Sequence, residues 1–254
     1  MENATKKIIF TTSWDDGDKL DLKLADLLER YGVKATFYIP KNFNNRLSDG
    51  DISQLSRRQE IGAHTISHLS LDKINPEEAW REIAESKNWL DGLLNRETKM
   101  FCYPRGHYND NIKNLVVRAG FIGARTVANG DNIDDVFQMP VSVQLYPFPL
   151  RRRSADKIHW SKFLLQPLIG NYGIIKKYNL PLKSCLSWHN FARSYFSAVR
   201  ERGGVFHLWG HSWEIEKYQM WSQLEKLLQF ISQKDEVVYL TNSQTIEYAN
   251  NNIK

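Results

Sequence analysis

The chain has 254 residues, 42% of them hydrophobic and 25% charged, a composition typical of a soluble globular protein with a sizeable core. Its net charge of +5 is mild and spread out, so nucleic acid is not an expected partner. The polar N-terminus contains no signal-peptide segment, and no apolar run is long enough to span a bilayer. A cytoplasmic protein without an integral membrane segment is therefore expected.

Two smaller features of the composition add little to this expectation. The densest positive cluster, the three arginines at 151–153, is interpreted as a solvated loop, with a phosphate or membrane-surface contact as the alternative. Cys102 and Cys185 lie far apart and form no CxxC pair, so nothing in the chain demands an oxidising compartment.

Apolar strand-like runs alternate with helical periodicity along the chain. The first strand is expected from Ile8 to the carboxylates Asp15 and Asp16. Residues 146–188 contain four prolines and are interpreted as an irregular insertion within a single domain spanning residues 1–254. Further strands are expected over 35–39, 61–64, 99–103, 121–127, 136–144, 203–209 and 237–240, and helices over 18–32, 52–58, 76–90, 112–120, 191–202 and 221–231.

Strands that alternate with helices at this rhythm predict an α/β protein with a parallel sheet. No glycine-rich phosphate loop follows the first strand, which disfavours nucleotide binding and an open doubly wound sheet. A barrel is the favoured interpretation. Its active site would lie at the carboxyl ends of the strands.

The first strand ends in two adjacent carboxylates, Asp15 and Asp16, followed by Gly17, which permits a tight turn. Taken alone, this sequence favours a loop with two solvated acids. If both face one pocket, one can bind a metal while the other accepts a proton, because nearby charges separate otherwise similar carboxylates. The residues downstream favour this second interpretation.

Candidate ligands for a metal follow the third strand. His64 and His68 are four residues apart, a spacing at which two histidines can bind one metal from a helical turn. Zinc peptidases with a related spacing carry a glutamate after the first histidine, but this chain has Thr65 there, so a peptidase of that kind is disfavoured. With Asp16, the pair would form a His-His-Asp site with open positions for water and substrate.

These stretches resemble the polysaccharide deacetylase family, also called carbohydrate esterase family four or the chitooligosaccharide-deacetylase homology domain. The family's first motif, usually Thr-Phe-Asp-Asp-Gly, is similar to residues 13–17, Ser-Trp-Asp-Asp-Gly. Its second motif, His-Ser/Thr-x-x-His, is matched by residues 64–68. Both matches are specific and in order, and the similarity is expected to cover most of the chain.

The resemblance implies a distorted (β/α) barrel of about seven parallel strands. It also implies a metal-dependent hydrolase that removes N-acetyl groups from a carbohydrate, and so acts on carbon–nitrogen bonds other than peptide bonds. By the same resemblance Asp16, His64 and His68 would hold a divalent metal, usually zinc, and Asp15 would be the general base. The expected partner is an N-acetylated sugar.

The later family motifs match less well. The third commonly reads Arg-Pro-Pro-Tyr-Gly, and here Cys102 stands where the arginine that orients the base is expected. Arg105 either replaces that arginine or binds substrate, and its backbone N–H is a candidate oxyanion donor. For the fourth motif the only candidate is Asp131.

The fifth motif normally offers one histidine, whereas this chain offers His207 and His211. They are four residues apart, so on an unbroken strand both would face the same side. His211 is favoured as the general acid because it lies nearer the strand end, and His207 is expected deeper, among apolar neighbours. Aromatic side chains beside these residues are candidates for stacking on sugar rings: Trp14, Tyr108, Trp209 and Trp213.

Two alternatives stay open on the sequence alone. One is an amidohydrolase that uses the same site on a small non-sugar amide. The other is a catalytically silent barrel that only binds glycan, an interpretation that the departure at Cys102 allows. The sequence does not specify the acetylated substrate, its length, the metal in the cell or the oligomeric state.

Overall fold

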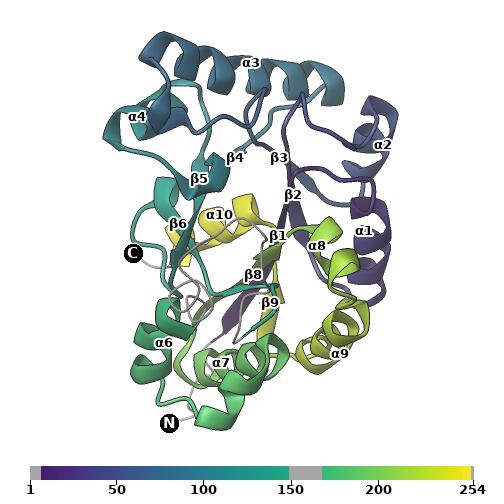
Figure 1. Ribbon diagram of the computed structural model, residues 1–254, viewed down its shortest axis with the longest axis vertical. Helices are drawn as coiled ribbons and strands as arrows, with labels where there is room; N and C mark the ends of the chain where they lie inside the picture. The colour runs from purple at the N-terminus through teal and green to yellow at the C-terminus, as the bar shows by residue number, and fades with distance from the viewer. Residues whose placement is uncertain (1–6, 149–167, 253–254) are drawn as a thin grey trace, which may run out of the picture.

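A parallel sheet forms the centre of the molecule in the computed structural model, which describes residues 7–148 and 168–252. Its strands follow the order β6-β5-β4-β3-β2-β1-β8-β7, and β9 pairs with β1 (Figure 1). Every one of these pairs is parallel. The strands are β1 (Ile8–Asp15), β2 (Ala35–Ile39), β3 (Glu60–Ala63), β4 (Met100–Cys102), β5 (Gly123–Asn129), β6 (Met139–Val141), β7 (Val143–Gln144), β8 (Gly204–Gly210) and β9 (Val237–Tyr239).

The two ends of this strand order meet at Ser142. β6 pairs with β5 and β7 pairs with β8, yet only Ser142 separates β6 from β7 in the chain. Its backbone N–H donates to the carbonyl of His207 in β8 at 2.8 Å. The sheet therefore curves into a nearly closed barrel, and the predicted distorted (β/α) barrel is confirmed.

One of the expected strands is divided in two in the structure. The strand expected over 136–144 begins with a short 3-10 turn, η3 (Val136–Gln138), and then divides at Ser142, where its hydrogen-bonding partner changes from β5 to β8. The pattern of apolar residues does not show which neighbouring strand each residue pairs with. The sequence therefore predicts one strand where the barrel has two.

β1 is the most extensively paired strand of the barrel. It lies beside β8 from Ile8 to Trp14, while its first three residues also pair with β9 and its last four pair with β2. All eight of its residues are buried. This position explains its apolar sequence, because a strand covered on both faces excludes water throughout. It also places Asp15, the last residue of β1, at the barrel's carboxyl end.

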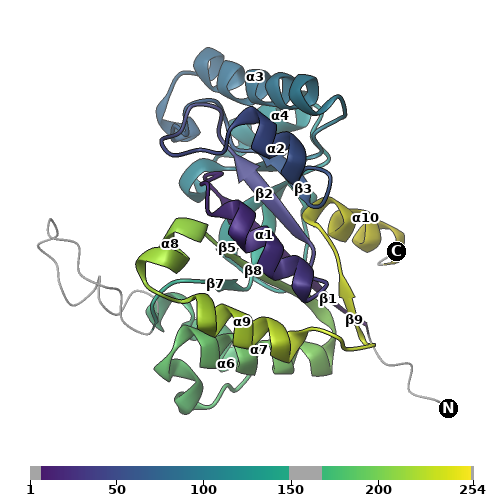
Figure 2. The same cartoon turned by 90° about the vertical axis from the view of Figure 1, so that its right-hand side faces the viewer.

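Helices surround the barrel and connect most consecutive strands, as parallel pairing requires. α6 and α7 lie together at the end of the molecule opposite α3 (Figures 1 and 2). The helices are α1 (Asp21–Arg30), α2 (Asp49–Leu55), α3 (Pro76–Leu94), α4 (Asp110–Arg118), α6 (Tyr172–Lys177), α7 (Trp188–Arg202), α8 (Ser212–Lys217), α9 (Trp221–Ile231) and α10 (Asn242–Asn252).

α10, which the sequence analysis does not predict, closes the amino end of the barrel. The backbone N–H of its fully buried first residue, Asn242, donates to Thr36 Oγ1 at 2.9 Å, near the start of β2. The N–H of Ser243 donates to Glu60, the first residue of β3, at 3.1 Å. Several asparagines make this helix a weak one by local propensity, and its contacts with the barrel compensate. The carboxyl end of the barrel is left for a site.

The irregular insertion expected over residues 146–188 lies partly outside the described residues, because 149–167, including the three arginines, are not among them. Its described part contains α6 and a 3-10 turn, η4 (Leu182–Leu186), which packs on α7. That the chain forms a single domain stays a prediction. Over 7–148 and 168–252, no helix combines the length and apolar character needed to cross a membrane.

Candidate active site

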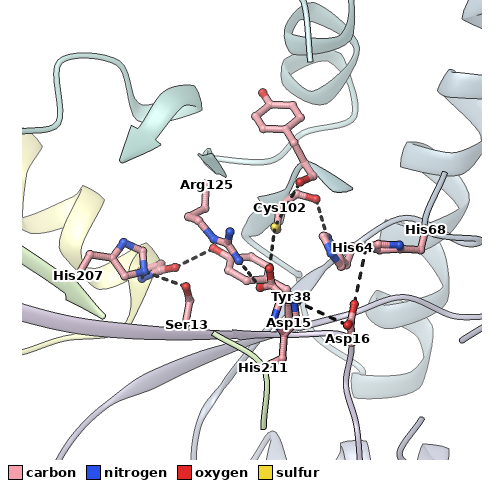
Figure 3. A network of polar contacts seen from close by, with 12 residues as sticks. Ser13, Asp15, Asp16, Tyr38, His64, His68, Cys102, Arg125, His207 and His211 are labelled. Atoms are coloured by element: carbon pink, nitrogen blue, oxygen red, sulfur yellow. Dashed lines mark hydrogen bonds and ion pairs between the residues drawn. The ribbon is translucent and has the colours of Figure 1, made fainter. Parts of the chain in front are cut away.

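The two carboxylates at the end of β1 point to different partners because the backbone turns sharply between them. Asp16 has a positive φ of 77°, and Gly17 follows with a φ of 62°. The left-handed region is uncommon for residues other than glycine, and its occurrence often marks a functional site. Figure 3 shows the result: Asp15 faces Arg125, whereas Asp16 lies on the side of His68.

Asp16, His64 and His68 lie together, as the sequence analysis expects. One potential ligand atom from each lies within 4.8 Å of the other two. The two histidines do not sit on a helical turn, however: His64 directly follows β3, and His68 lies in the loop beyond it. A loop brings residues four apart to one point only if its backbone is held in shape.

α3 supplies that support. Glu82, which is buried on α3, accepts hydrogen bonds from the backbone N–H groups of Ile66 (2.9 Å) and Ser67 (2.7 Å). Thr65 has a φ of 69° and accepts a further hydrogen bond at Oγ1 from the N–H of His68 (2.9 Å). These bonds hold the loop, and with it the two imidazoles, against the end of β1.

The donor set of Asp16, His64 and His68 fits a divalent metal. Oδ1 of Asp16 is buried and has no hydrogen-bond partner among the described residues, although it lies 3.6 Å from His68 Nε2. His64 donates from Nδ1 to the carbonyl of Cys102 at 2.8 Å, so Nε2 keeps its lone pair for a ligand. Burial lowers the pKa of His64 to about 4, against the attraction of Asp15, and the neutral imidazole is the form that binds metal.

A second group of three, Asp15, His64 and Cys102, meets the same distance criterion but fits a metal less well. Burial raises the pKa of the Cys102 thiol well above its ordinary value, whereas thiol ligands bind metals as thiolates. Asp15 is already engaged by a cation. The carboxylate with the orphaned oxygen is the better ligand, which favours Asp16.

That cation is Arg125 of β5, which the sequence analysis does not identify as a site residue. Its side chain is fully buried, and Nη2 donates to Oδ1 of Asp15. The guanidinium carbon lies 4.8 Å from the centre of the Trp209 ring and 5.3 Å from that of Tyr38. Burial alone would raise the pKa of Asp15, but Arg125, with His64 and His211, outweighs it and lowers that pKa. Asp15 is thus held as an ionised carboxylate.

Arg105 does not take the place of the missing third-motif arginine. It is exposed, lies in the short turn η2 (Pro104–Gly106) with a φ of 58°, and lines the cavity described below. Cys102 stands in the expected arginine position, with its Sγ 3.9 Å from Asp15 Oδ2. The partner of Asp15 therefore comes from the next strand, β5. One indication of this role is present in the sequence: Arg125 is a charged residue inside the mostly apolar strand expected over 121–127, and charged side chains are rarely buried without a partner.

His211 lies at the site, as expected. It directly follows β8, and its Nε2 is 3.7 Å from Asp16 Oδ2. Its Nδ1 forms a 2.7 Å hydrogen bond with Oε2 of Glu214 on α8. Burial opposes a positive charge here, but Glu214 and the two aspartates outweigh it and raise the pKa of His211 to about 9. The imidazole is therefore protonated at neutral pH.

His207 occupies a different position, deeper in the barrel. It is 1% exposed and is not among the residues that line the cavity. Its Nε2 lies 2.8 Å from Ser13 Oγ, and its Nδ1 lies 3.0 Å from the Pro140 carbonyl. Both ring nitrogens thus have polar partners, whereas the sequence analysis names apolar neighbours. Burial and the nearby Arg125 lower the pKa of His207 to about 3, so it is neutral.

A cavity of about 500 Å³ opens beside these groups. Four of its lining residues are Asp15, His64, His68 and His211, and much of the remaining wall is aromatic. Trp209 is the only residue of the four expected sugar-stacking candidates that lines it. The aromatic lining residues are Tyr103, Tyr146, Phe148, Trp188, Phe191 and Trp209.

The other expected residues have structural contacts instead. Trp14 is fully buried in the core. Trp213 donates from Nε1 to Asp16 Oδ2 at 3.1 Å, and Tyr108 stacks on Tyr103 with ring centres 4.6 Å apart. Asp131, the candidate for the fourth motif, lies outside the cavity wall and forms an ion pair with Lys177 at 2.7 Å.

Comparison with known sequences supports the family resemblance of the motifs over the first half of the chain. Residues 2–124 match the sequence profile of a family described as polysaccharide deacetylase. The Bacillus subtilis protein YxkH, whose name assigns it provisionally to the polysaccharide deacetylases, is 30% identical over 125 residues, or 47% of this chain and 44% of its own. A peptidoglycan-N-acetylglucosamine deacetylase of Bacillus cereus is 29% identical over 101 residues, covering 39% of this chain and 37% of that relative.

The chain thus spans less than half the length of these two relatives. The expectation of sequence similarity over most of the chain is too broad, because the family profile ends at residue 124. Arg125 and His211 both lie beyond that end.

Solved structures extend the similarity of the fold. A Mycobacterium smegmatis protein, also assigned provisionally to the polysaccharide deacetylases, superposes with a TM-score of 0.70 at 16% identity over 99% of this chain and 93% of its own. The Xyl-CE4 domain of a xylanase from the Trinervitermes trinervoides hindgut metagenome gives a TM-score of 0.54 at 13% identity, over 96% and 92% of the two chains. The distorted barrel is therefore shared over nearly the whole length.

Proposed function

The chain belongs, through its residues 2–124, to the polysaccharide deacetylase family, and from that premise we propose that it is a metal-dependent hydrolase that removes N-acetyl groups from a carbohydrate. The substrate is a poly- or oligosaccharide or a sugar precursor, and the metal is zinc. The cytoplasmic location expected from the sequence stays a prediction.

One observation carries this proposal. Two adjacent carboxylates at the end of β1 have opposite surroundings. Asp16 has a buried oxygen without a hydrogen-bond partner among the described residues, beside His64 and His68, whose pKa values burial lowers. Asp15 is bound to Arg125. The first set of groups suits a metal, and the second suits a fixed, ionised base. Asp15 also lines the cavity, where a substrate would meet it.

Each residue then has a defined task. A divalent ion held by Asp16, His64 and His68 would polarise an acetyl carbonyl and acidify a water molecule. Asp15 accepts the proton of the attacking water, and Arg125 keeps Asp15 ionised and oriented before the attack. Asp15 therefore starts the reaction as a base, which its lowered pKa favours.

His211 completes the proposed reaction as the general acid. It lines the cavity, and Glu214 holds it in its protonated form through Nδ1, leaving Nε2–H to donate a proton to the departing amine. His207 lacks access to the cavity, so we assign it a supporting role. The backbone N–H of Arg105, in the turn η2 beside the cavity, is the proposed oxyanion donor.

The aromatic wall supports a sugar as the substrate, because flat apolar faces suit stacking on the C–H faces of sugar rings. The Bacillus cereus relative is named for N-acetylglucosamine in peptidoglycan, which makes that sugar the first to test. The silent-barrel alternative rested on the missing arginine at Cys102. Arg125 supplies an equivalent positive partner for Asp15 and so weakens that alternative.

The test is acetate release from a panel of N-acetylated mono-, oligo- and polysaccharides and of small non-sugar amides. Protein stripped with EDTA is assayed before and after zinc is added back. We expect release from at least one sugar, restored by zinc. Release from the non-sugar amides alone would establish the amidohydrolase alternative, and metal retention without release from any compound would favour a silent barrel.

A further inference from the structure

The segment from Ile169 to Leu186 presents an unusual set of apolar side chains to solvent. Among the described residues, the large hydrophobic side chains with the highest exposure are Leu182 (84%), Leu186 (71%), Tyr172 (64%) and Ile169 (62%). The next, Val117 on α4, is 47% exposed. Single exposed apolar residues are ordinary, but four such residues within eighteen positions indicate a surface with a partner.

This segment is also cationic. It contains three lysines, Lys176, Lys177 and Lys183, and no aspartate or glutamate, so it carries a charge of +3. Lys176 at the end of α6 and Lys183 in η4 are both exposed and lie in sequence between the exposed apolar residues. Lys177 forms an ion pair with Asp131, which leaves Lys176 and Lys183 as the lysines of the segment without an ion-pair partner among the described residues.

Buried neighbours hold the segment in this arrangement. Ile174, Tyr178, Leu180 and Cys185 lie in the chain between the first and the last of the exposed residues and are each at most 9% exposed, so they anchor α6 and η4 to the body of the molecule. The exposed side chains are therefore the outer face of a packed segment.

The segment borders the mouth of the active-site cavity. Gly170 and Asn171 line the cavity and stand between Ile169 and Tyr172 in the chain. Asn129 at the end of β5 donates to the carbonyl of Gly170 at 2.9 Å, which fixes this part of the segment at the carboxyl end of the barrel. At the other end, Trp188 lines the cavity two residues after Leu186.

We propose that α6 and η4 form a membrane-contact surface that binds the anionic face of a lipid bilayer. Exposed leucines beside lysines are the composition of segments that lie in a bilayer interface, where the apolar side chains enter the acyl boundary and the lysines meet lipid phosphates. Two copies of the chain meeting through this face would oppose like charges, which disfavours a self-interface. The cavity opens beside the bilayer, whichever reaction it performs.

The experiment is sedimentation of the full chain with vesicles of pure phosphatidylcholine and with vesicles containing an equal share of phosphatidylglycerol. We expect binding to the anionic vesicles only, weakened in about 0.5 M salt, where screening shortens electrostatic attraction. Changing Leu182 and Leu186 together to serine should reduce binding about tenfold or more. Changing Lys176 and Lys183 to glutamine should reduce it about fivefold for each lysine.

The matched control is Val117→Ser, an exposed apolar residue on α4 outside the segment, which should bind as the unchanged chain does. Melting temperatures should agree among all variants because every changed side chain is exposed. Failure of the unchanged chain to sediment with anionic vesicles would overturn the proposal, as would full binding by the double serine variant. Light scattering that shows a dimer abolished by the same double change would assign the face to self-association instead.

Discussion

Arg125 and Asp15 form a buried ion pair that joins β5 to the end of β1, although the two residues are 110 positions apart in the chain. The Arg125 side chain is fully buried, with the rings of Tyr38 and Trp209 beside its guanidinium, and Asp15 lines the cavity. Removing one partner from such a pair leaves an uncompensated buried charge. The consequences for stability and for the proposed base should therefore be large.

We expect Arg125→Gln to lower the free energy of unfolding by about 3–5 kcal/mol, measured by denaturant titration. Because Arg125 lowers the pKa of Asp15, the acid limb of the pH–rate profile should move to higher pH, with a loss of activity of about 10²-fold or more. Arg105→Gln is the control and should leave both that limb and stability unchanged. An acid limb that moves in Arg105→Gln but not in Arg125→Gln would reverse the assignment.

The metal ligands make a separate prediction. One divalent ion per chain should be bound by Asp16, His64 and His68, with ligand distances of about 2.0–2.2 Å if it is zinc. His64→Ala and His68→Ala should each lose metal by elemental analysis, since each removes one of three protein donors. Cys102→Ser should keep it, because the thiol is neutral and outside the ligand set. Full retention in both histidine variants would refute this site.

The variant Asp15→Asn should distinguish the role of general base from that of metal ligand. The amide cannot accept the proton from water, so turnover should fall by roughly 10²–10⁴-fold while metal content stays at one per chain. Asp16→Asn should lower both metal content and turnover, because Oδ1 of Asp16 has no hydrogen-bond partner among the described residues and is free to bind the ion. Loss of metal from Asp15→Asn combined with retention in Asp16→Asn would mean that the roles are exchanged.

The two histidines of the β8 region should differ in what their removal changes. His211→Ala should abolish most activity and remove the descending high-pH limb of the pH–rate profile, because this residue faces the cavity in protonated form. His207→Ala should instead lower the melting temperature, through a cavity and the loss of its bonds to Ser13 and the Pro140 carbonyl, with the profile's shape preserved. The opposite pattern would make His207 the acid.

The pH dependence of stability offers an independent check on His211. Its pKa rises on folding from about 6.5 to about 9, so its charge stabilises the fold fully below pH 6.5 and progressively less as pH rises through 9. The melting temperature of EDTA-treated protein should fall over that window. Glu214→Gln removes the main partner of Nδ1 and should flatten the fall. An equally steep fall in this variant would show that another group titrates.

The sequence by itself determined the elements whose signals are local. Alternating strands and helices predicted the parallel barrel, and Asp15, Asp16 and the His64–His68 spacing marked the centre of the site. These features are readable because strand periodicity and motif spacing depend only on residues close together in the chain. The position of His211 beyond Gly210 belongs to the same class.

Only the tertiary structure decided which distant residues meet. In the sequence Arg125 is a single cation in an apolar strand. In the structure β5 pairs with β4, and the Arg125 side chain meets Asp15. Ser142 divides one expected strand because its two sides pair with opposite ends of the sheet. α10, weak by its own composition, forms where Asn242 enters the amino end of the barrel. In each case the deciding free energy comes from burial and hydrogen bonds between segments far apart in the chain, which local patterns do not encode.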